Sequence, residues 1–288
     1  MRQDIRLMRA SDLAAVNDLL RQAYKNPAND YTGRLLRHLE LQPDGWLVVE
    51  RDGRVVATGG GTVMGPVGYI GLVGVDPALH RQGIGAALMD ELIAFLRSQG
   101  CATILLDASD MGRPLYLKLG FAVDDTVSIW HADTAQSLLS AAPGAISVTP
   151  YAATDLTQII AFDTAGFGAP RDRIVAAFLQ DNPATTWISR DASDQLAGYL
   201  TYAPSHNFIG PWLASTPDSA SALLHAALAQ SGVQALTLHT PDANQAATRL
   251  LRGVGFTPVR TLAHMRMGPP LASTRRQMVY GQINLALG

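Results

Sequence analysis

The sequence has few charged residues and almost no cysteine. Charged residues make up 16% of the 288 positions and hydrophobic residues 48%, whereas soluble domains usually carry roughly 25% charged residues. A single cysteine forms no intrachain disulfide, which excludes a disulfide-stapled extracellular scaffold. The formal net charge of -2 provides no overall positive field for nucleic acid. The composition therefore predicts a globular chain with a large core.

Signals for export and membrane insertion are also weak. Five of the first dozen residues are charged, which leaves no apolar core for a signal peptide. Residues 55–75 carry no charge over 21 residues, but they include seven glycines and one proline. Because glycine-rich backbone is a poor continuous helix, we expect two buried strands around a turn here rather than a membrane span. The interpretation is a cytoplasmic protein with no membrane partner.

Metal-ligand patterns are missing as well. The chain has seven histidines, none of them spaced as a close pair with another histidine or with the cysteine. Cys101 begins an apolar segment after a helix-ending glycine, which is typical of a small buried filler. We therefore expect no metal site.

The most informative feature that is present is an internal repeat. Trp46 corresponds to Trp187 at an offset of 141, and Gly120 to Gly255 at an offset of 135. Between the copies the residues are small and polar, so we predict domains at 1–132 and 146–288 joined by a linker at 133–145. The second copy lacks five residues directly before one helix, because the offset falls there from 140 to 135. A deletion confined to one loop suggests that the second copy has lost that loop's function.

The loop kept by the first copy joins an apolar strand to a helix through His80-Arg81-Gln82-Gly83-Ile84-Gly85. Glycines at such a turn let backbone N–H groups converge on an anion, and the helix N-terminus favours negative charge. Arg81 adds a positive side chain. The pattern is typical of a pyrophosphate-binding turn, although a tight turn that only packs a helix on a sheet is the alternative.

A second motif, Leu115-Tyr116-Leu117-Lys118-Leu119-Gly120-Phe121, follows after a predicted strand. The two motifs together, in this order and spacing, resemble the GNAT acyltransferase superfamily over about residues 4–131. The end of the second copy looks like the carboxy-terminal domain of bacterial tandem-GNAT proteins. The resemblance implies an α/β fold of α+β layers: two tandem GNAT folds, each a mixed, mostly antiparallel sheet flanked by helices.

The resemblance also implies a reaction. Acetyl-CoA would be the donor, and a primary amine of a small molecule or amino acid would be the acceptor. Tyr116 would protonate the departing thiolate, and the strand that includes Val73, Gly74 and Val75 would pair with pantetheine and polarise the thioester carbonyl. The implied cofactor-binding set is Val73, Gly74, Val75, His80, Arg81, Gln82, Gly83, Ile84, Gly85, Ala86, Ser109 and Tyr116.

The sequence departs from the family pattern at several positions. His80 stands where the family has Gln or Arg, and Ser109 where it often has Asn. No carboxylate lies in residues 69–75, where many members place a general base, so Asp107, Asp110 or a water chain remain alternatives. We name Tyr31 as an acceptor-site candidate, because its surroundings predict an exposed loop carrying an aromatic residue.

The second copy has lost the features that carry the chemistry. It has no glycine pair before its helix, Asp218 would repel a phosphate, and Leu251 stands where the acid tyrosine should be. We therefore expect a GNAT fold that binds no acetyl-CoA. Its expected role is to pack on the first copy through an apolar interface, which would account for the low charge, and to help form the acceptor site.

Other functions remain possible at this point. A CoA-binding sensor with little activity and a protein N-acetyltransferase are the alternatives, and the chain is expected to be a monomer or homodimer. A nicotinamide-binding enzyme is disfavoured, because no acidic ribose ligand follows the glycines at the expected position.

Overall fold

The structure is a computed structural model that describes residues 4–133, 146–229, 235–271 and 274–288. The predicted linker at 133–145 lies outside the described residues except for Asp133. The elements of the first half are β1 (Asp4–Leu7), α1 (Leu13–Ala23), α2 (Thr32–Leu41), β2 (Trp46–Arg51), β3 (Arg54–Met64), β4 (Val67–Val75), α3 (Ile84–Ser98), β5 (Thr103–Ala108), α4 (Arg113–Lys118) and β6 (Ala122–Ala132). Those of the second half are β7 (Ser147–Pro150), α5 (Leu156–Phe167), α6 (Asp172–Asp181), β8 (Thr186–Arg190), β9 (Leu196–Ala203), β10 (Phe208–Ala214), α7 (Pro217–Leu228), β11 (Leu236–Pro241), α8 (Gln245–Gly253), β12 (Thr257–Met267) and β13 (Val279–Gly281).

Local patterns form the elements that they predict. The β2–β3 hairpin turns through Asp52 and Gly53, both with positive φ, which suits the twist of a two-residue turn. The uncharged segment 55–75 forms β3 and β4, as expected. Across the described residues, no helix combines the length and the apolar character needed to cross a membrane.

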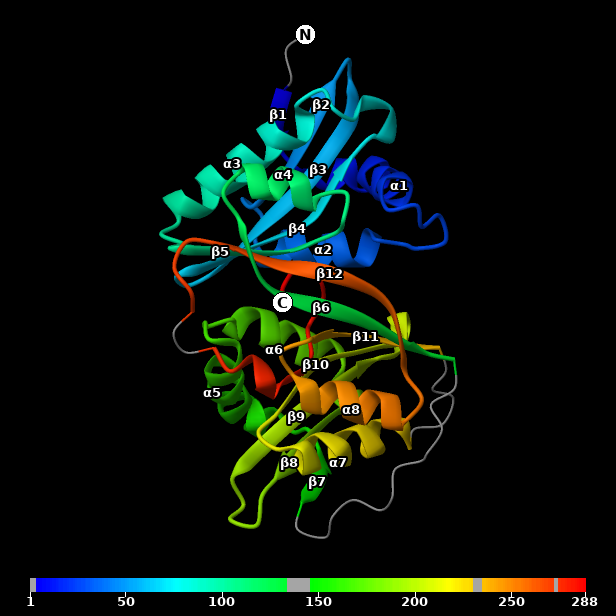
Figure 1. Ribbon diagram of the computed structural model, residues 1–288, viewed down its shortest axis with the longest axis vertical. Helices are drawn as coiled ribbons and strands as arrows, with labels where there is room; N and C mark the ends of the chain where they lie inside the picture. The colour runs from blue at the N-terminus through cyan, green and yellow to red at the C-terminus, as the bar shows by residue number, and fades with distance from the viewer. Residues whose placement is uncertain (1–3, 134–145, 230–234, 272–273) are drawn as a thin grey trace.

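All strands belong to one sheet. Its order is β1-β2-β3-β4-β5-β12-β6-β11-β10-β9-β8-β7, and β13 pairs with β10 off this path. The pairs are antiparallel except β4 with β5 and β10 with β11, which are parallel. The mixed, mostly antiparallel sheet is therefore confirmed. The second half repeats the first in reverse spatial order about the β12–β6 pair, which crosses the middle of the molecule in Figure 1.

The two copies exchange their last strands. β6 belongs by chain to the first half, yet it pairs with β11 of the second half. β12 belongs by chain to the second half, yet it pairs with β5 of the first. The two exchanged strands also pair with each other. Each half therefore supplies a strand to the sheet of the other, an arrangement that the sequence pattern alone did not predict.

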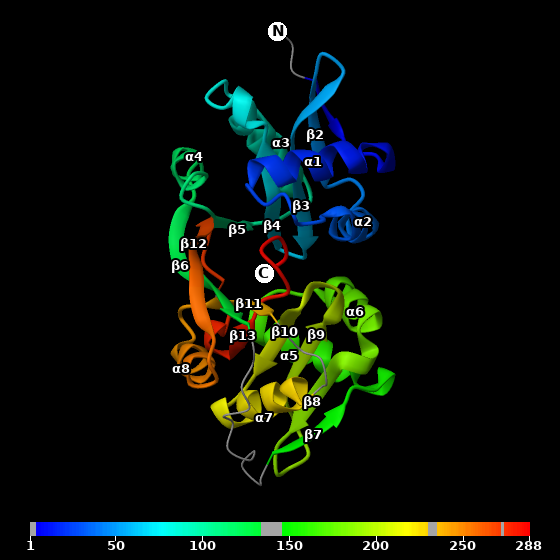
Figure 2. The same ribbon diagram turned by 90° about the vertical axis from the view of Figure 1, so that its right-hand side faces the viewer.

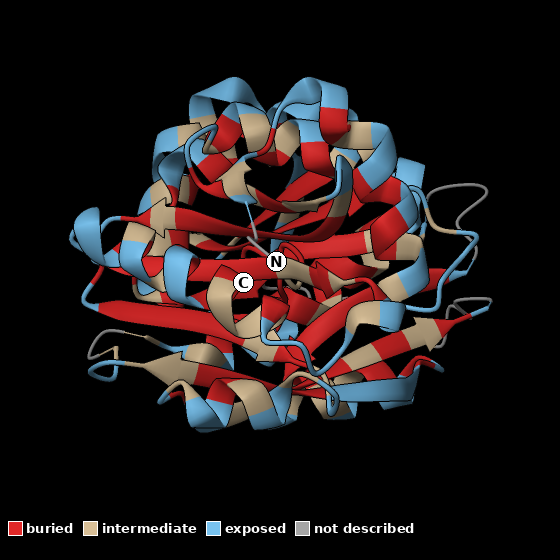
Figure 3. Ribbon diagram, turned by 90° about the horizontal axis from the view of Figure 1, so that it is seen from above, coloured by how far each residue is buried: buried red, intermediate tan, exposed pale blue. Residues whose placement is uncertain are grey.

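Helices cover both faces of the sheet. Packing places α3 against one face of the first half, whereas α1 and α2 cover the other. Figure 2 shows α2 and α6 facing each other on one side, with α4 and α8 on the opposite side. Strands and the inner sides of helices are buried, and the outer helix faces are exposed (Figure 3). One buried apolar cluster includes Tyr69 and Leu105 of the first half with Phe167 and Leu213 of the second, so the contact between the halves has an apolar core.

Candidate active site

The first half contains a gap between its two parallel strands. β4 pairs with β5 only over Val67–Ile70 and Thr103–Leu106, although β4 continues to Val75. Leu72 has a φ of 51°, and the register of β4 with β3 shifts nearby. Among the described residues, no strand pairs with the β5-facing edge of β4 beyond this point. The backbone groups of that edge are available to an extended ligand.

The predicted residues Val73, Gly74 and Val75 lie on this unpaired stretch of β4. The hydroxyl of Tyr24, at the end of α1, donates to the carbonyl oxygen of Val73 at 3.1 Å. Tyr24 therefore contacts the part of the edge where a cofactor is expected, and it was not among the predicted site residues.

The glycine-rich loop leads from this edge into α3. Arg81 and Gly83 have φ values of 61° and 81°, so the loop needs the conformational freedom of glycine at position 83. Gly83 is the N-cap of α3 and has no side chain to satisfy the first N–H groups of the helix, among them those of Gly85 and Ala86. These N–H groups, together with the helix dipole, form a ready anion site.

Two side chains of the loop are held by neighbours. The Nε2 atom of His80 lies 3.2 Å from the carbonyl oxygen of Val75, so its ring is directed at the end of β4. The Oε1 atom of Gln82 accepts from Arg51 Nη1 at 2.8 Å. Arg51 thus brings a further positive charge to the loop, from the β2–β3 hairpin rather than from the motif.

Tyr116 lies on α4 and is 8% exposed. Its ring meets the edge of Phe121 at 6.1 Å and packs against Gly112, where a Cβ atom would lie 2.9 Å from the ring. Burial raises the pKa of Tyr116 to about 12. Ser109 accepts a hydrogen bond from the N–H of Gly112 at the start of this helix. The tyrosine is therefore held rigidly and stays protonated at neutral pH.

A pocket of about 210 Å³ joins the edge of β4 with Tyr24 and Tyr116. Both halves of the chain contribute to its lining. Its lining consists of Tyr24, Asn26, Tyr31, Arg34, Ile70, Gly71, Leu72, Val73, Leu106, Asp107, Ser109, Tyr116, Arg260, Leu262, Leu285 and Ala286. Of the predicted residues, Tyr116, Val73, Ser109 and Tyr31 therefore meet in one pocket, whereas the loop residues 80–86 lie outside its lining.

Tyr31 is in the pocket and follows a mostly exposed loop, but its own side chain is buried, so the expected exposure of this residue was wrong. It is only 5% exposed, packs in the cluster with Val16 and Leu35, and precedes α2. Its N–H donates to Asn17 Oδ1 at 2.8 Å. The aromatic ring is buried because it closes the space between α1 and α2, and it lies 5.9 Å from the ring of Tyr24.

The two carboxylates considered as bases do not face the pocket. The side chain of Asp107 is 0% exposed, so its contribution to the lining is backbone. It accepts from Tyr69 at 2.7 Å and from His264 at 2.8 Å. Burial favours the neutral carboxyl, but these two partners outweigh it and hold the pKa of Asp107 below its ordinary value. Asp110 is exposed and is not part of the lining.

In the second copy the corresponding gap is filled. The short strand β13 pairs with β10 at Trp212 and Leu213, on the edge that has no partner strand in the first copy. Asn244, the N-cap of α8, donates to the carbonyl oxygen of Val279 in β13 at 3.1 Å. Thr240 of β11 donates to Tyr280 at 2.7 Å. A strand of the chain itself therefore occupies the place where the first copy offers a free edge.

The helix that follows this filled gap is capped internally. The Oγ1 atom of Thr216 accepts from the N–H of Ser219 at 3.2 Å, and Pro217 at the first position has no N–H. β10 ends at Ala214, so only two residues separate it from α7. The shortened loop thus leaves the second copy without an open anion site.

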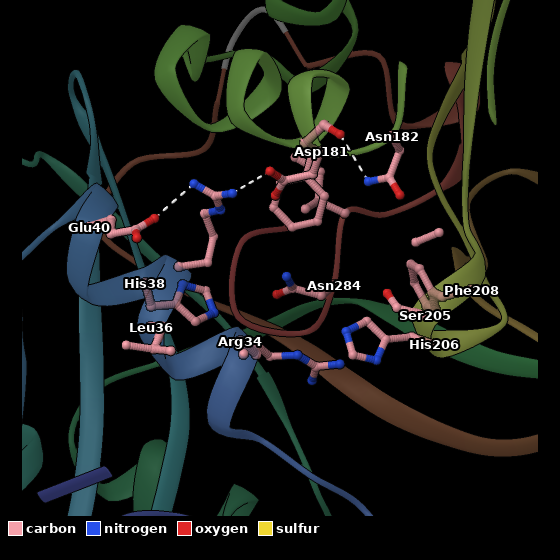
Figure 4. Close-up of a pocket in the computed structure, with 15 residues that line it drawn as sticks. Arg34, Leu36, His38, Glu40, Asp181, Asn182, Ser205, His206, Phe208 and Asn284 are labelled. Atoms are coloured by element: carbon pink, nitrogen blue, oxygen red, sulfur yellow. Dashed lines mark hydrogen bonds and ion pairs between the residues drawn. The ribbon is translucent and has the colours of Figure 1, made fainter. Parts of the chain in front are cut away.

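A larger pocket of about 520 Å³ adjoins the first, between α2 and the second half (Figure 4). Arg34 lines both pockets, and its side chain extends toward His206. Arg37, one turn later on α2, is paired with Glu40 and Asp181. Sequence reasoning missed Arg34 and the second-half residues Arg260 and Leu262, because nothing in their local pattern distinguishes them from other arginines and leucines.

Comparison with known proteins supports the same fold and family. The model of the acetyltransferase (GNAT) family matches residues 13–121, and a second acetyltransferase (GNAT) domain model matches residues 159–281. An acetyltransferase of Pectobacterium atrosepticum is 31% identical over 130 residues, which are 44% of this chain and 92% of that protein. A glucosamine 6-phosphate N-acetyltransferase of Trypanosoma brucei brucei is 46% identical over 55 residues, 19% of this chain and only 37% of that enzyme.

Solved structures share the fold at low sequence identity. A Pyrococcus horikoshii protein described as an acetyltransferase has a TM-score of 0.85 at 23% identity, covering 99% of this chain and 96% of its own. A tandem GNAT protein from the clavulanic acid biosynthesis pathway has a TM-score of 0.65 at 15% identity, covering 93% and 100%. The two family matches, the relative matched over nearly its whole length and the duplicated fold agree. The chain belongs to the GNAT acetyltransferase family, with two GNAT domains in tandem.

Proposed function

We propose that the protein transfers an acetyl group from acetyl-CoA directly to a primary amine of a small molecule, using only its first copy. The observation that carries this proposal is the contrast between the copies. In the first, a free strand edge and a buried tyrosine line one pocket, and the strand leads into an uncapped helix N-terminus. In the second, β13 and Thr216 close the corresponding strand edge and helix N-terminus.

The residues of the first copy fit acetyl-CoA. The edge of β4 from Leu72 to Val75 offers backbone groups to the amides of pantetheine. The N–H groups at Gly83–Ala86 and the guanidinium of Arg81 offer a site for pyrophosphate. When bound, acetyl-CoA would supply the acetyl group as an activated thioester.

Tyr116 would act at the sulfur of the leaving group. Because its pKa is raised to about 12, it holds its proton at neutral pH and donates a hydrogen bond as negative charge develops. Backbone N–H groups of β4 near Leu72 would donate to the carbonyl oxygen of the thioester. The chain thereby stabilises both places where charge appears as the C–N bond forms and the C–S bond breaks.

The proton of the amine needs an acceptor, and the pocket presents no free carboxylate. We infer that the proton leaves to water, as one of the sequence alternatives allowed. A small-molecule acceptor is supported by the small volume of the pocket, about 210 Å³, and by the relative that is named for glucosamine 6-phosphate.

The test is release of CoA thiol from acetyl-CoA across a panel of primary amines, with acetylated product confirmed by mass. Thiol release that depends on an amine supports the proposal. Tight acetyl-CoA binding with no release from any amine would instead favour the CoA-binding sensor. Release only with peptides or proteins would favour a protein N-acetyltransferase.

A further inference from the structure

Two arginines on helix α2 have opposite surroundings. The guanidinium of Arg37 pairs with the carboxylates of Glu40 and Asp181. That of Arg34 has no hydrogen bond or ion pair to any described residue, although it lines both pockets. Desolvation lowers the pKa of Arg34, whose side chain is half-buried and faces the two pockets. Its N–H groups are therefore available to donate to an anionic ligand that enters the pockets.

A second unpaired arginine lines the smaller pocket. Arg260 comes from the exchanged strand β12 and also has no ion-pair partner in the ranges that the structure describes. Arg34, Arg260 and Tyr24 line the same pocket, and the charges of both arginines act to lower the pKa of the Tyr24 hydroxyl. The two guanidiniums therefore act on the same part of the pocket. No carboxylate side chain is open to this pocket, because Asp107 is turned away.

We propose that Arg34 and Arg260 bind an anionic group of the acceptor, so that the substrate is an amine that also carries a carboxylate or a phosphate. This inference rests on the proposed acetyl transfer and adds the class of acceptor. Both anions accept hydrogen bonds from a guanidinium in a paired, planar geometry. Their shared chemistry is a negative group fixed at Arg34 while the amine lies near Tyr116.

The geometry also provides room for the rest of such a molecule. Arg34 stands where the pocket of about 210 Å³ meets the one of about 520 Å³. The larger pocket offers polar side chains from Ser205, His206 and Asn284 beside the aromatic ring of Phe208 (Figure 4). An acceptor anchored by its anion at Arg34 can therefore extend into the larger pocket without leaving the transfer site.

The experiment compares amines that differ only in the anionic group, using thiol release from acetyl-CoA. One set of substrates tests a carboxylate and compares L-amino acids with their amides. The other set tests a phosphate and compares phosphoethanolamine with ethanolamine and glucosamine 6-phosphate with glucosamine. We expect kcat/KM for the anionic member to exceed that of its neutral partner about tenfold or more in one set, since a charged hydrogen bond contributes that much. The set with the preference identifies the anion.

Variants of Arg34 and Arg260 test whether these two residues cause the preference for the anionic amine. Arg34→Gln and Arg260→Gln should remove it mainly by raising KM for the amine, with KM for acetyl-CoA unchanged, whereas Arg34→Lys should keep part of it. The matched control is Arg173→Gln, an exposed arginine of α6 that lines neither pocket. Circular dichroism checks that the variants fold. Because Arg260 is exposed, Arg260→Gln should fold and can still test the proposal if the Arg34 variant does not fold.

Each outcome has a defined meaning. Amine-dependent thiol release with equal or better use of the neutral partners would overturn the anionic acceptor and leave acetyl transfer standing. A preference that survives both glutamine variants would overturn the assignment to these arginines. No thiol release with any amine would overturn the proposed function and this inference together.

Discussion

Mild acid should destabilise the fold through two buried histidines. His38 on α2 is 1% exposed, stacks on Trp46 at 4.6 Å, and neither ring nitrogen has a hydrogen-bond partner among the described residues. Burial, with a smaller contribution from Arg34, lowers the pKa of His38 to about 3. Burial likewise lowers the pKa of His239, which packs on Phe208, to about 3. Both rings are neutral in the folded chain and cannot accept a proton without losing that packing.

Acid lowers the stability because the unfolded state binds protons at a higher pH than the folded state does. In the unfolded chain a histidine has a pKa of about 6.5, so the unfolded state takes up protons below that pH while the folded state does not. Stability is therefore full above about pH 6.5 and falls by about 1.4 kcal/mol per pH unit for each histidine. At pH 5 the loss is about 2 kcal/mol for each and about 4 kcal/mol for both, a large share of a typical 5–15 kcal/mol.

Denaturant unfolding at pH 8, 7, 6 and 5 measures this loss. His38→Leu removes one titrating group at similar volume and should remove about half of the pH dependence, and His239→Leu should do the same at the other site. The window above pH 5 isolates histidines, because carboxylates in unfolded chains titrate near pH 4. A pH dependence that is identical in wild type and both leucine variants would refute the reasoning.

Three further outcomes are expected around the site. Tyr116→Phe should lower kcat about a hundredfold or more while the Kd of acetyl-CoA is unchanged; unaltered turnover in steady-state assays would contradict the role of the hydroxyl. Calorimetric titration should give one CoA per chain, because β13 fills the second gap; two sites would contradict that account. Gly71→Val places a side chain where a Cβ atom would lie 2.2 Å from the Cβ atom of Ala286. We expect the free energy of unfolding, measured with denaturant, to fall by about 1–3 kcal/mol and the KM for the amine to rise. Unchanged values would show that the segment at Ala286 does not form the pocket wall.

Most features of the first copy were predictable from the local sequence. The turn at Asp52 and Gly53, the glycine at position 83 and the position of Tyr116 on a short helix all follow from residue chemistry within a few positions. The deleted loop of the second copy was also visible, because it changes the offset between the copies. These features are predictable because each one depends only on residues that are close together in the sequence.

Features that depend on distant partners were not predictable in this way. The local sequence gives Arg37 a partner in Glu40, but only the fold shows that Asp181, far along the chain, also pairs with Arg37 and that Arg34 lines two pockets. Tyr31 was expected on a loop surface because its neighbours are polar, but packing against α1 buries it. Burial and charge pairing of single side chains are decided by tertiary contacts, which one-dimensional patterns do not contain.

The strand exchange explains how the second copy contributes residues to the pocket of the first. β6 and β12 have the pattern of a last strand whichever sheet they join, so the sequence could not distinguish exchange from two separate sheets. The exchange places Arg260 and Leu262 of the second copy in the pocket of the first. Without β12, the edge of β5 would lose its partner strand and become exposed to pairing with other chains. The second copy therefore contributes to the site by completing its sheet and its pocket, a role that is independent of binding acetyl-CoA.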